Sequence, residues 1–177
     1  METPGEELKK YEKDEDEELL EEGRSTIFRK IAARCNYISA DRPDIMYSVK
    51  EVCRGMAKPT VGGWKKLKRI GRYLIGKTRA SISYKWQGRE EEIDGYTDSD
   101  WAGCRATGKS TSGGVLMIGG NFIKVWSKTQ NSIALSSAEA ELIAMAKLSA
   151  EALGLISLAR DLGEEKIGKV TPVQQLP

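Results

Sequence analysis

The spacing of apolar residues predicts two amphipathic helices in the first half of the chain. After Pro43, a residue suited to a first helical turn, apolar side chains recur at steps of three and four up to Met56, and Pro59 ends the pattern. The same period returns from Trp64 to Ile75. The basic residues of this second segment fall mostly on the side opposite its apolar face.

The period changes to two beyond residue 80, which predicts strands. Ile82 and Tyr84 alternate with polar residues, and residues 93–101 form a second run of this kind. Two further runs flank Gly119 and Gly120, and the glycine pair predicts that they form a hairpin. We therefore expect three or four short strands between residues 80 and 130.

Helical spacing resumes after Ser136 and predicts one long helix that ends near Leu162. The order of elements is then helices, strands and a long helix, which is an α/β arrangement. The pattern assigns the following residues to the apolar face of the long helix: Leu142, Met145, Ala146, Leu153 and Ile156.

Composition narrows the class of protein. With 177 residues, 40% of them hydrophobic and 31% charged, the chain can bury a core, so wholesale disorder is ruled out. No window approaches eighteen uninterrupted apolar residues, and the acidic N-terminus differs from a secretory signal. We expect no membrane partner and an intracellular setting, with cytoplasm and nucleus not distinguished.

The absence of histidine removes several kinds of active site. The sequence contains no His, which excludes Ser-His-Asp, Cys-His and HExxH chemistry. Catalysis would have to use carboxylates, lysine or a metal ion. Cys35, Cys53 and Cys104 are far apart and form no CxxC pair, so we expect reduced thiols.

The near-neutral net charge hides two segments of opposite sign. Residues 1–22 hold eleven acidic residues and three lysines, whereas residues 58–89 hold ten basic residues and no acidic one. A basic run of this density can neutralise a phosphate backbone. A solvated helix face explains it equally well. The candidate nucleic-acid contacts are Lys65, Lys66, Lys68, Arg69 and Arg72.

Four carboxylates are candidates for metal chemistry. Asp98 and Asp100 lie two apart in a predicted strand, so both project from one face. Glu139 and Glu141 begin the long helix, which could lean across that strand. Clustered carboxylates of this kind hold paired Mg²⁺ ions in nucleases.

The four carboxylates are not equal as candidates. Ser136 and Glu139 form a capping box, which already gives Glu139 a role at the helix start. Glu141 lies outside the cap and is the better ligand candidate. Asp100 can serve a turn before Trp101, so Asp98 is the stronger of the two aspartates.

A competing motif spans Gly103 to Ser110, which fits the GxxxxGK[ST] pattern of phosphate-binding P-loops. That loop needs a buried apolar strand before it and a helix after it. Here the preceding run is acidic and the following residues predict a turn into a strand. We therefore regard nucleotide binding by this motif as disfavoured.

Four blocks of sequence stand out, at residues 96–103, 109–114, 126–130 and 134–141. In order and spacing they resemble the ribonuclease H domain of copia-type retrotransposon Pol polyproteins. The chain also resembles the segment that precedes this domain, through Asn36-Tyr37-Ile38, Arg42-Pro43-Asp44-Ile45 and the run from Trp64 to Leu74. The resemblance covers about residues 25–163.

The resemblance implies cleavage of the RNA strand of an RNA/DNA hybrid, with Mg²⁺ or Mn²⁺ held by four carboxylates. Asp98 and Glu141 match two of these, and Asp100 and Glu139 are possible substitutes. The family's third carboxylate lies on the strand after the long helix and its fourth near the end of the domain, but no acidic residue follows Glu165 here. We therefore expect weak metal binding and an inactive or nearly inactive chain.

The implied fold is an incomplete ribonuclease H-like fold, with the first strands and first long helix but without a central strand and the later helices. The polymerase signature Tyr-x-Asp-Asp is absent, which excludes reverse transcription. The expected organisation is an acidic, solvated leader (1–23), a basic helical connection segment (24–90) and a partial ribonuclease H-like domain (91–177). A nucleic-acid-binding remnant that uses residues 58–89 and a relic without function remain the alternatives.

Overall fold

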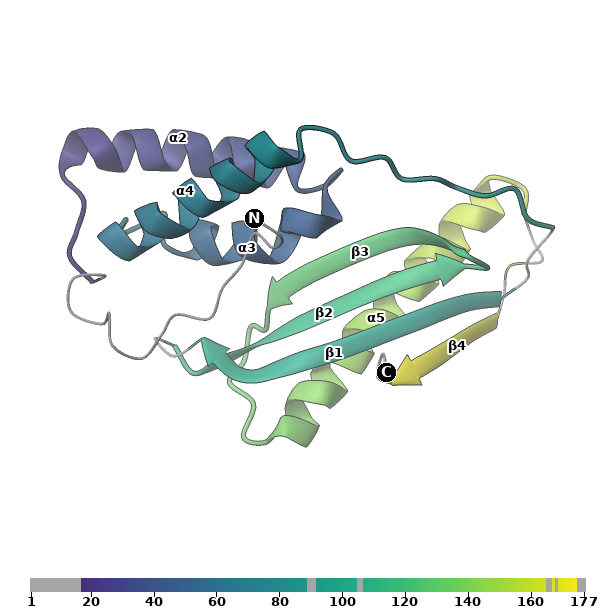
Figure 1. Ribbon diagram of the computed structural model, residues 1–177. Coiled ribbons are helices and arrows are strands. Elements are labelled where there is room, and N and C mark those ends of the chain that lie inside the picture. The colour runs from purple at the N-terminus through teal and green to yellow at the C-terminus, as the bar shows by residue number, and fades with distance from the viewer. Residues whose placement is uncertain (1–16, 89–91, 105–106, 165–166, 168, 175–177) are drawn as a thin grey trace. The chain divides into compact units, whose positions relative to one another are not determined.

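The computed structural model describes residues 17–88, 92–104, 107–164, 167 and 169–174 (Figure 1). The chain divides into two compact units, with the boundary between residues 81 and 82. The sequence predicted this division after residue 90. The boundary lies earlier in the structure because residues 82–88 are hydrogen-bonded to the second unit. Gln87 Nε2 donates to the Ile118 carbonyl, and the Lys85 backbone N–H donates to Asn121 Oδ1. Each unit is described by itself.

The described part of the first unit contains three helices, α2 (Glu22–Ile38), α3 (Pro43–Arg54) and α4 (Val61–Gly76). The last two confirm the helices predicted from apolar spacing. Pro43 begins α3 where its missing amide hydrogen costs nothing, and the Thr60 hydroxyl caps α4 by accepting from Gly63 N–H at 3.2 Å.

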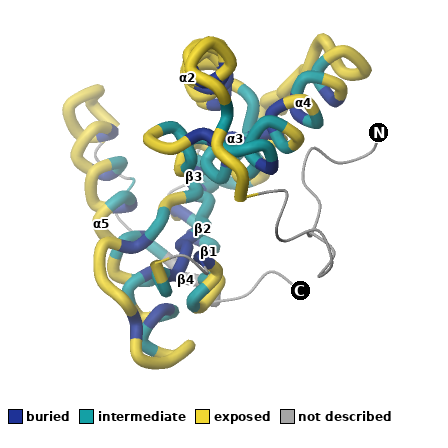
Figure 2. The backbone as a smooth tube through the Cα atoms, turned by 90° about the vertical axis from the view of Figure 1, so that its left-hand side faces the viewer, coloured by how far each residue is buried: buried dark blue, intermediate teal, exposed yellow. Residues whose placement is uncertain are grey.

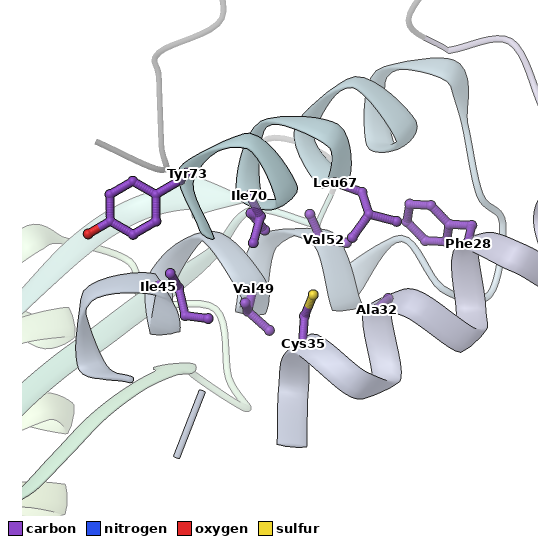
Figure 3. Packing of buried hydrophobic residues seen from close by; sticks show 9 residues of the cluster. All are labelled: Phe28, Ala32, Cys35, Ile45, Val49, Val52, Leu67, Ile70 and Tyr73. Atoms are coloured by element: carbon purple, nitrogen blue, oxygen red, sulfur yellow. The ribbon is translucent and has the colours of Figure 1, made fainter. Parts of the chain in front are cut away.

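Large apolar side chains from all three helices fill the core of the first unit, as Figure 3 shows. Phe28, Ile45 and Ile70 are completely buried. Each buried side chain of this size stabilises the fold by about 1.5–3 kcal/mol. The core residues are Phe28, Ala32, Cys35, Ile45, Val49, Val52, Leu67, Ile70 and Tyr73.

The end of the acidic segment is fixed to the start of α4 by backbone pairing. Leu20 N–H donates to the Pro59 carbonyl and Val61 N–H donates to the Glu18 carbonyl, both at 2.9 Å. Leu19 and Thr60 form an antiparallel bridge. Residues 18–20 are therefore ordered, which corrects the prediction of a solvated leader over this part; residues 1–16 of that prediction lie outside the described residues.

The second unit is built on a mixed four-stranded sheet. Its strands are β1 (Glu92–Cys104), β2 (Lys109–Ile118), β3 (Asn121–Thr129) and β4 (Lys169–Gln174), in the order β3-β2-β1-β4. Neighbours β1–β2 and β2–β3 are antiparallel, and β4 runs parallel to β1 (Figure 1). The predicted hairpin around Gly119 and Gly120 is confirmed.

Two strand predictions were wrong. Ile82 and Tyr84 lie in an extended segment that is not a strand, where the Tyr84 ring packs near Phe122 with 6.0 Å between centroids. A strand does follow the long helix: β4 pairs with β1 from Glu92–Lys169 to Thr97–Gln174. The expectation that the sheet lacks this strand is thereby corrected.

Helix α5 (Ser137–Asp161) packs on one face of the sheet, and Figure 2 shows its buried positions in a stripe along one side. The predicted face was partly wrong, since Leu142 and Leu153 are 66% and 65% exposed. Small residues allow close approach instead: a Cβ on Gly95 would lie 3.0 Å from the Leu148 side chain. The buried residues are Ala140, Ala144, Leu148, Ala152, Ile156 and Ala159.

Among the helices of the described residues, α5 alone is long and apolar enough to cross a membrane by length and composition. Core helices also pass this test, and the buried stripe of α5 contacts Ile93, Leu116 and Trp126 within the core of the second unit.

Candidate functional site

Strand β1 and helix α5 meet at Ser99. The Ser99 hydroxyl donates to Glu141 Oε1 at 2.9 Å, and the Ser99 amide donates to Asp98 Oδ1 at 2.8 Å. The two carboxylates preferred from the sequence are therefore each hydrogen-bonded to the same residue.

Alternation along β1 sets the directions of its side chains. Gly95 faces Leu148 of α5 and Ser99 contacts Glu141, so odd-numbered positions face the helix. Asp98 and Asp100 pair with Gly113 and Thr111 of β2, and both side chains are exposed. The helix therefore meets β1 at the residue between the two aspartates.

Glu139 is occupied by helix capping, as predicted. Its amide donates to Ser136 Oγ at 3.1 Å, and its Oε2 accepts from Leu135 N–H at 2.7 Å. These bonds satisfy donors at the start of α5 and place a negative charge at the positive end of the helix. One oxygen of Glu139 is thus already used.

The arrangement of carboxylates does not fit a pair of Mg²⁺ ions. Over the described part of the chain, no three His, Cys, Asp or Glu residues come together in a way that could hold a metal ion. Asp98 and Glu141 both have one oxygen engaged by Ser99. A two-metal centre needs several carboxylates converging on one point.

In the segment that matches the P-loop pattern, the described residues end β1, make a turn at Thr107 and Gly108, and begin β2. Gly108 adopts a left-handed backbone with φ 66°, and Gly108 N–H donates to the Cys104 carbonyl at 2.7 Å. Lys109 and Ser110 then lie in β2. Because no helix follows the loop, its amides have no helix N-terminus with which to bind phosphate.

The end of β1 carries backbone strain beside an exposed aromatic ring. Ala102 has φ 52°, which is uncommon for a residue with a Cβ, and its amide donates to the buried Ser110 hydroxyl at 3.1 Å. Trp101 is half exposed, and its Nε1 donates to the Ala134 carbonyl at 3.1 Å. The bond to Ala134 fixes the Trp101 ring beside the loop that leads into α5.

The connection between sheet and helix is reinforced by a buried amide. Gln130 Nε2 donates to Ser112 Oγ at 2.9 Å and to the Ala140 carbonyl at 2.8 Å. Gln130 is 5% exposed, so these bonds replace those that its side-chain nitrogen would make with water, whereas its Oε1 has no hydrogen-bond partner among the described residues.

The predicted nucleic-acid contacts lie on α4 with unequal exposure. Lys65, Lys68 and Arg72 are exposed, whereas Lys66 and Arg69 are half-buried. Lys68 Nζ lies 6.0 Å from the centre of the Trp64 ring. An exposed cationic face therefore exists on α4, formed by three of the five candidates.

Comparisons with known proteins relate this chain to mobile genetic elements. It is 36% identical over 138 residues to the Pol polyprotein of transposon RE2 from Arabidopsis thaliana, which is 78% of this chain and 9% of that protein. It is 33% identical over 114 residues to a secreted RxLR effector of Plasmopara viticola, which is 64% of this chain and 80% of that protein. The chain is related to a region of retrotransposon Pol polyproteins.

This Pol-derived chain also matches an uncharacterized mitochondrial protein of Arabidopsis thaliana, at 37% identity over 124 residues, 70% of the chain. It spans 51% of that relative and 9% of the RE2 polyprotein. No family model matches the chain, and no solved structure matches it.

The contacts of Ser99, Ser110 and Gln130 were not found from the sequence of the Pol-derived chain. Each links segments that are distant along the chain, and periodicity reports only which face a residue occupies. The Ser and Thr residues of 109–114 lie inside one of the blocks that carry the family resemblance, which was the available signal.

Proposed function

We propose that this chain is a ribonuclease H-like remnant of a retrotransposon Pol polyprotein that does not cleave RNA/DNA hybrids on its own. The fold is consistent with this proposal, because β1 lies between antiparallel β2 and parallel β4 with α5 on one face. The observation that carries the proposal is the placement of Glu141 on Ser99, with Asp98 exposed on the neighbouring position.

A weak metal site is the physical basis for expecting inactivity. Hydrolysis of a phosphodiester by metal ions depends on ligands that hold the ions in place, and small displacements are costly. Asp98 and Glu141 are the two residues that match the family's ligand positions. Two monodentate carboxylates would leave most of the coordination sphere of Mg²⁺ to water.

The test is cleavage of an end-labelled RNA/DNA hybrid in Mg²⁺ and in Mn²⁺. We expect no metal-dependent cutting by protein that unfolds cooperatively. Metal-dependent cutting of the RNA strand that is lost in both Asp98→Asn and Glu141→Gln would overturn the proposal. In that event Asp100→Asn and Glu139→Gln identify any substitute ligand.

A second candidate function is nucleic-acid binding by α4. The helix Val61–Gly76 has five basic residues and no acidic one, and Lys65, Lys68 and Arg72 are exposed. Each phosphate contact that a cation makes releases condensed counterions, so binding of this kind weakens steeply with salt.

Fluorescence anisotropy with a labelled hybrid tests this second function. The double variant Lys68→Glu/Arg72→Glu is expected to weaken binding and to reduce the salt slope by about 2, since each lost phosphate contact lowers it by about 1. The matched control is Lys128→Glu, an exposed lysine on β3. Equal losses in the control and the double variant would contradict binding by α4.

A further inference from the structure

The geometry points to an intramolecular partner for the basic face of α4: the acidic residues 1–16 dock in the groove between α2 and α4. There they compete with nucleic acid for the same cations. The competition rests on the nucleic-acid binding proposed above, whereas the docking stands independently of it.

The groove has an apolar floor and a cationic rim. Its volume is about 290 Å³, and Gly71 contributes to its wall. A Cβ built on Gly71 meets no atom within 4 Å, and Ile75 is 79% exposed, so apolar surface is open to a ligand. The other lining residues are Ile31, Trp64, Leu67, Lys68, Arg72 and Ile75.

The pairing of residues 18–20 with 59–61 fixes where the acidic segment leaves the described structure. It leaves at the N-terminal end of α4, one turn before Trp64 begins the groove. The path from Thr60 to Ile75 measures about 23 Å at 1.5 Å per residue. Sixteen residues reach up to about 50 Å, so the segment can cover the whole groove.

The chemistry of the segment matches the groove. Residues 1–16 contain seven acidic residues against three lysines, and Leu8 and Tyr11 supply apolar side chains three positions apart. Acidic groups can pair with Lys68 and Arg72 at the rim while apolar ones cover the floor. Because the segment is tethered, its effective concentration at the groove is about millimolar, which lets a weak contact form.

Docking is tested by comparing amide NMR spectra of the full chain and a chain lacking residues 2–16. We expect shift differences at Lys68, Gly71 and Arg72 that shrink as salt is raised. A full-length variant with the seven acidic residues changed to Gln or Asn should resemble the deletion. Differences confined to residues 17–22, or shifts that depend on protein concentration because a second copy fills the groove, would overturn the proposal.

A groove-filling variant provides a second test in the intact chain. Gly71→Leu adds a side chain to open space and should preserve the thermal melt. We expect the shift differences between full and shortened chains to be lost in this background at Lys68 and Arg72. If these shift differences were as large in the Gly71→Leu background as in the wild type, docking in the groove would be contradicted.

Hybrid binding then separates this inference from the function on which it rests. The shortened chain is expected to bind a labelled RNA/DNA hybrid about 5- to 10-fold more tightly at 50 mM salt, with a smaller advantage at higher salt because screening weakens both contacts. If the shifts show docking but neither chain binds the hybrid, nucleic-acid binding fails and docking stands. If both chains bind the hybrid equally, the competition is overturned.

Discussion

Ser99 on β1 donates its hydroxyl proton to Glu141 near the start of α5, with 2.9 Å between the two oxygens. This bond joins residues from the two elements that hold the predicted carboxylates. Ser99→Ala should lower the free energy of unfolding by about 1 kcal/mol, because a charge-assisted hydrogen bond is lost at a half-buried site.

Urea unfolding measures this change. The control is Ser149→Ala, whose exposed hydroxyl donates to the Met145 carbonyl of its own helix. We expect the control to stay within about 0.5 kcal/mol of the wild type. Equal effects of the two substitutions would contradict a role for Ser99 in joining strand to helix.

Two adjacent glycines of β2 should respond differently to alanine. A Cβ on Gly114 would overlap the Trp126 ring, whereas one on Gly113 has only a backbone oxygen at 4.0 Å. Gly114→Ala should therefore cost about 1–3 kcal/mol of unfolding free energy through overpacking. Gly113→Ala is the matched control in the same strand, and thermal melts of the two variants should rank them in this order.

The first unit should lose stability in acid through Asp44. Its carboxylate accepts from Arg42 Nη2 at 2.7 Å and from the Tyr73 hydroxyl at 2.8 Å. The hydrogen bonds from Arg42, followed by that from Tyr73, hold the pKa of Asp44 below its ordinary value. The stabilisation is therefore full above pH about 4 and is lost as pH falls through the lower folded pKa.

Urea unfolding of wild type and Asp44→Asn between pH 7 and pH 2.5 tests this linkage. The stability difference between them should be present at pH 7 and should shrink below about pH 4. Asp41→Asn, at an exposed carboxylate nearby, is the control. A difference that stays constant over the whole range would show that Asp44 acts through packing instead.

The orientation of α5 can be tested with two leucines. Leu148 is 1% exposed against the sheet, whereas Leu153 is 65% exposed. Leu148→Ala should cost about 2–5 kcal/mol, and Leu153→Ala should change stability by less than about 1 kcal/mol. If chemical denaturation showed a larger loss of stability for Leu153→Ala than for Leu148→Ala, the face predicted from the sequence would be the buried one.

Apolar spacing predicted α3 and α4 because each helix has one apolar and one polar face. It failed to orient α5, where leucines such as Leu142 and Leu153 lie outside the contact with the sheet and alanines form much of that contact. When apolar residues surround a helix, their period no longer identifies the buried side. Which side packs is then decided by close approach, as between Leu148 and Gly95.

The sequence predicted the carboxylates but not their surroundings. The capping role of Glu139 is local, so a four-residue pattern sufficed to predict it. The bond between Ser99 and Glu141 joins residues 42 positions apart. Strand β4 escaped prediction because it is short and contains Pro172, which is typical of a strand at a sheet edge.

The parallel pairing of β4 with β1 has a consequence for the order in which the second unit folds. Strands β1, β2 and β3 are connected in sequence by short turns, whereas Glu92 meets Lys169 only after two strands and α5 have intervened. Closing so long a loop is entropically expensive, so β4 should pair late and open first. Backbone amides of β4 should exchange with deuterium faster than those of β2, which makes this strand a reporter of whether α5 has docked on the sheet.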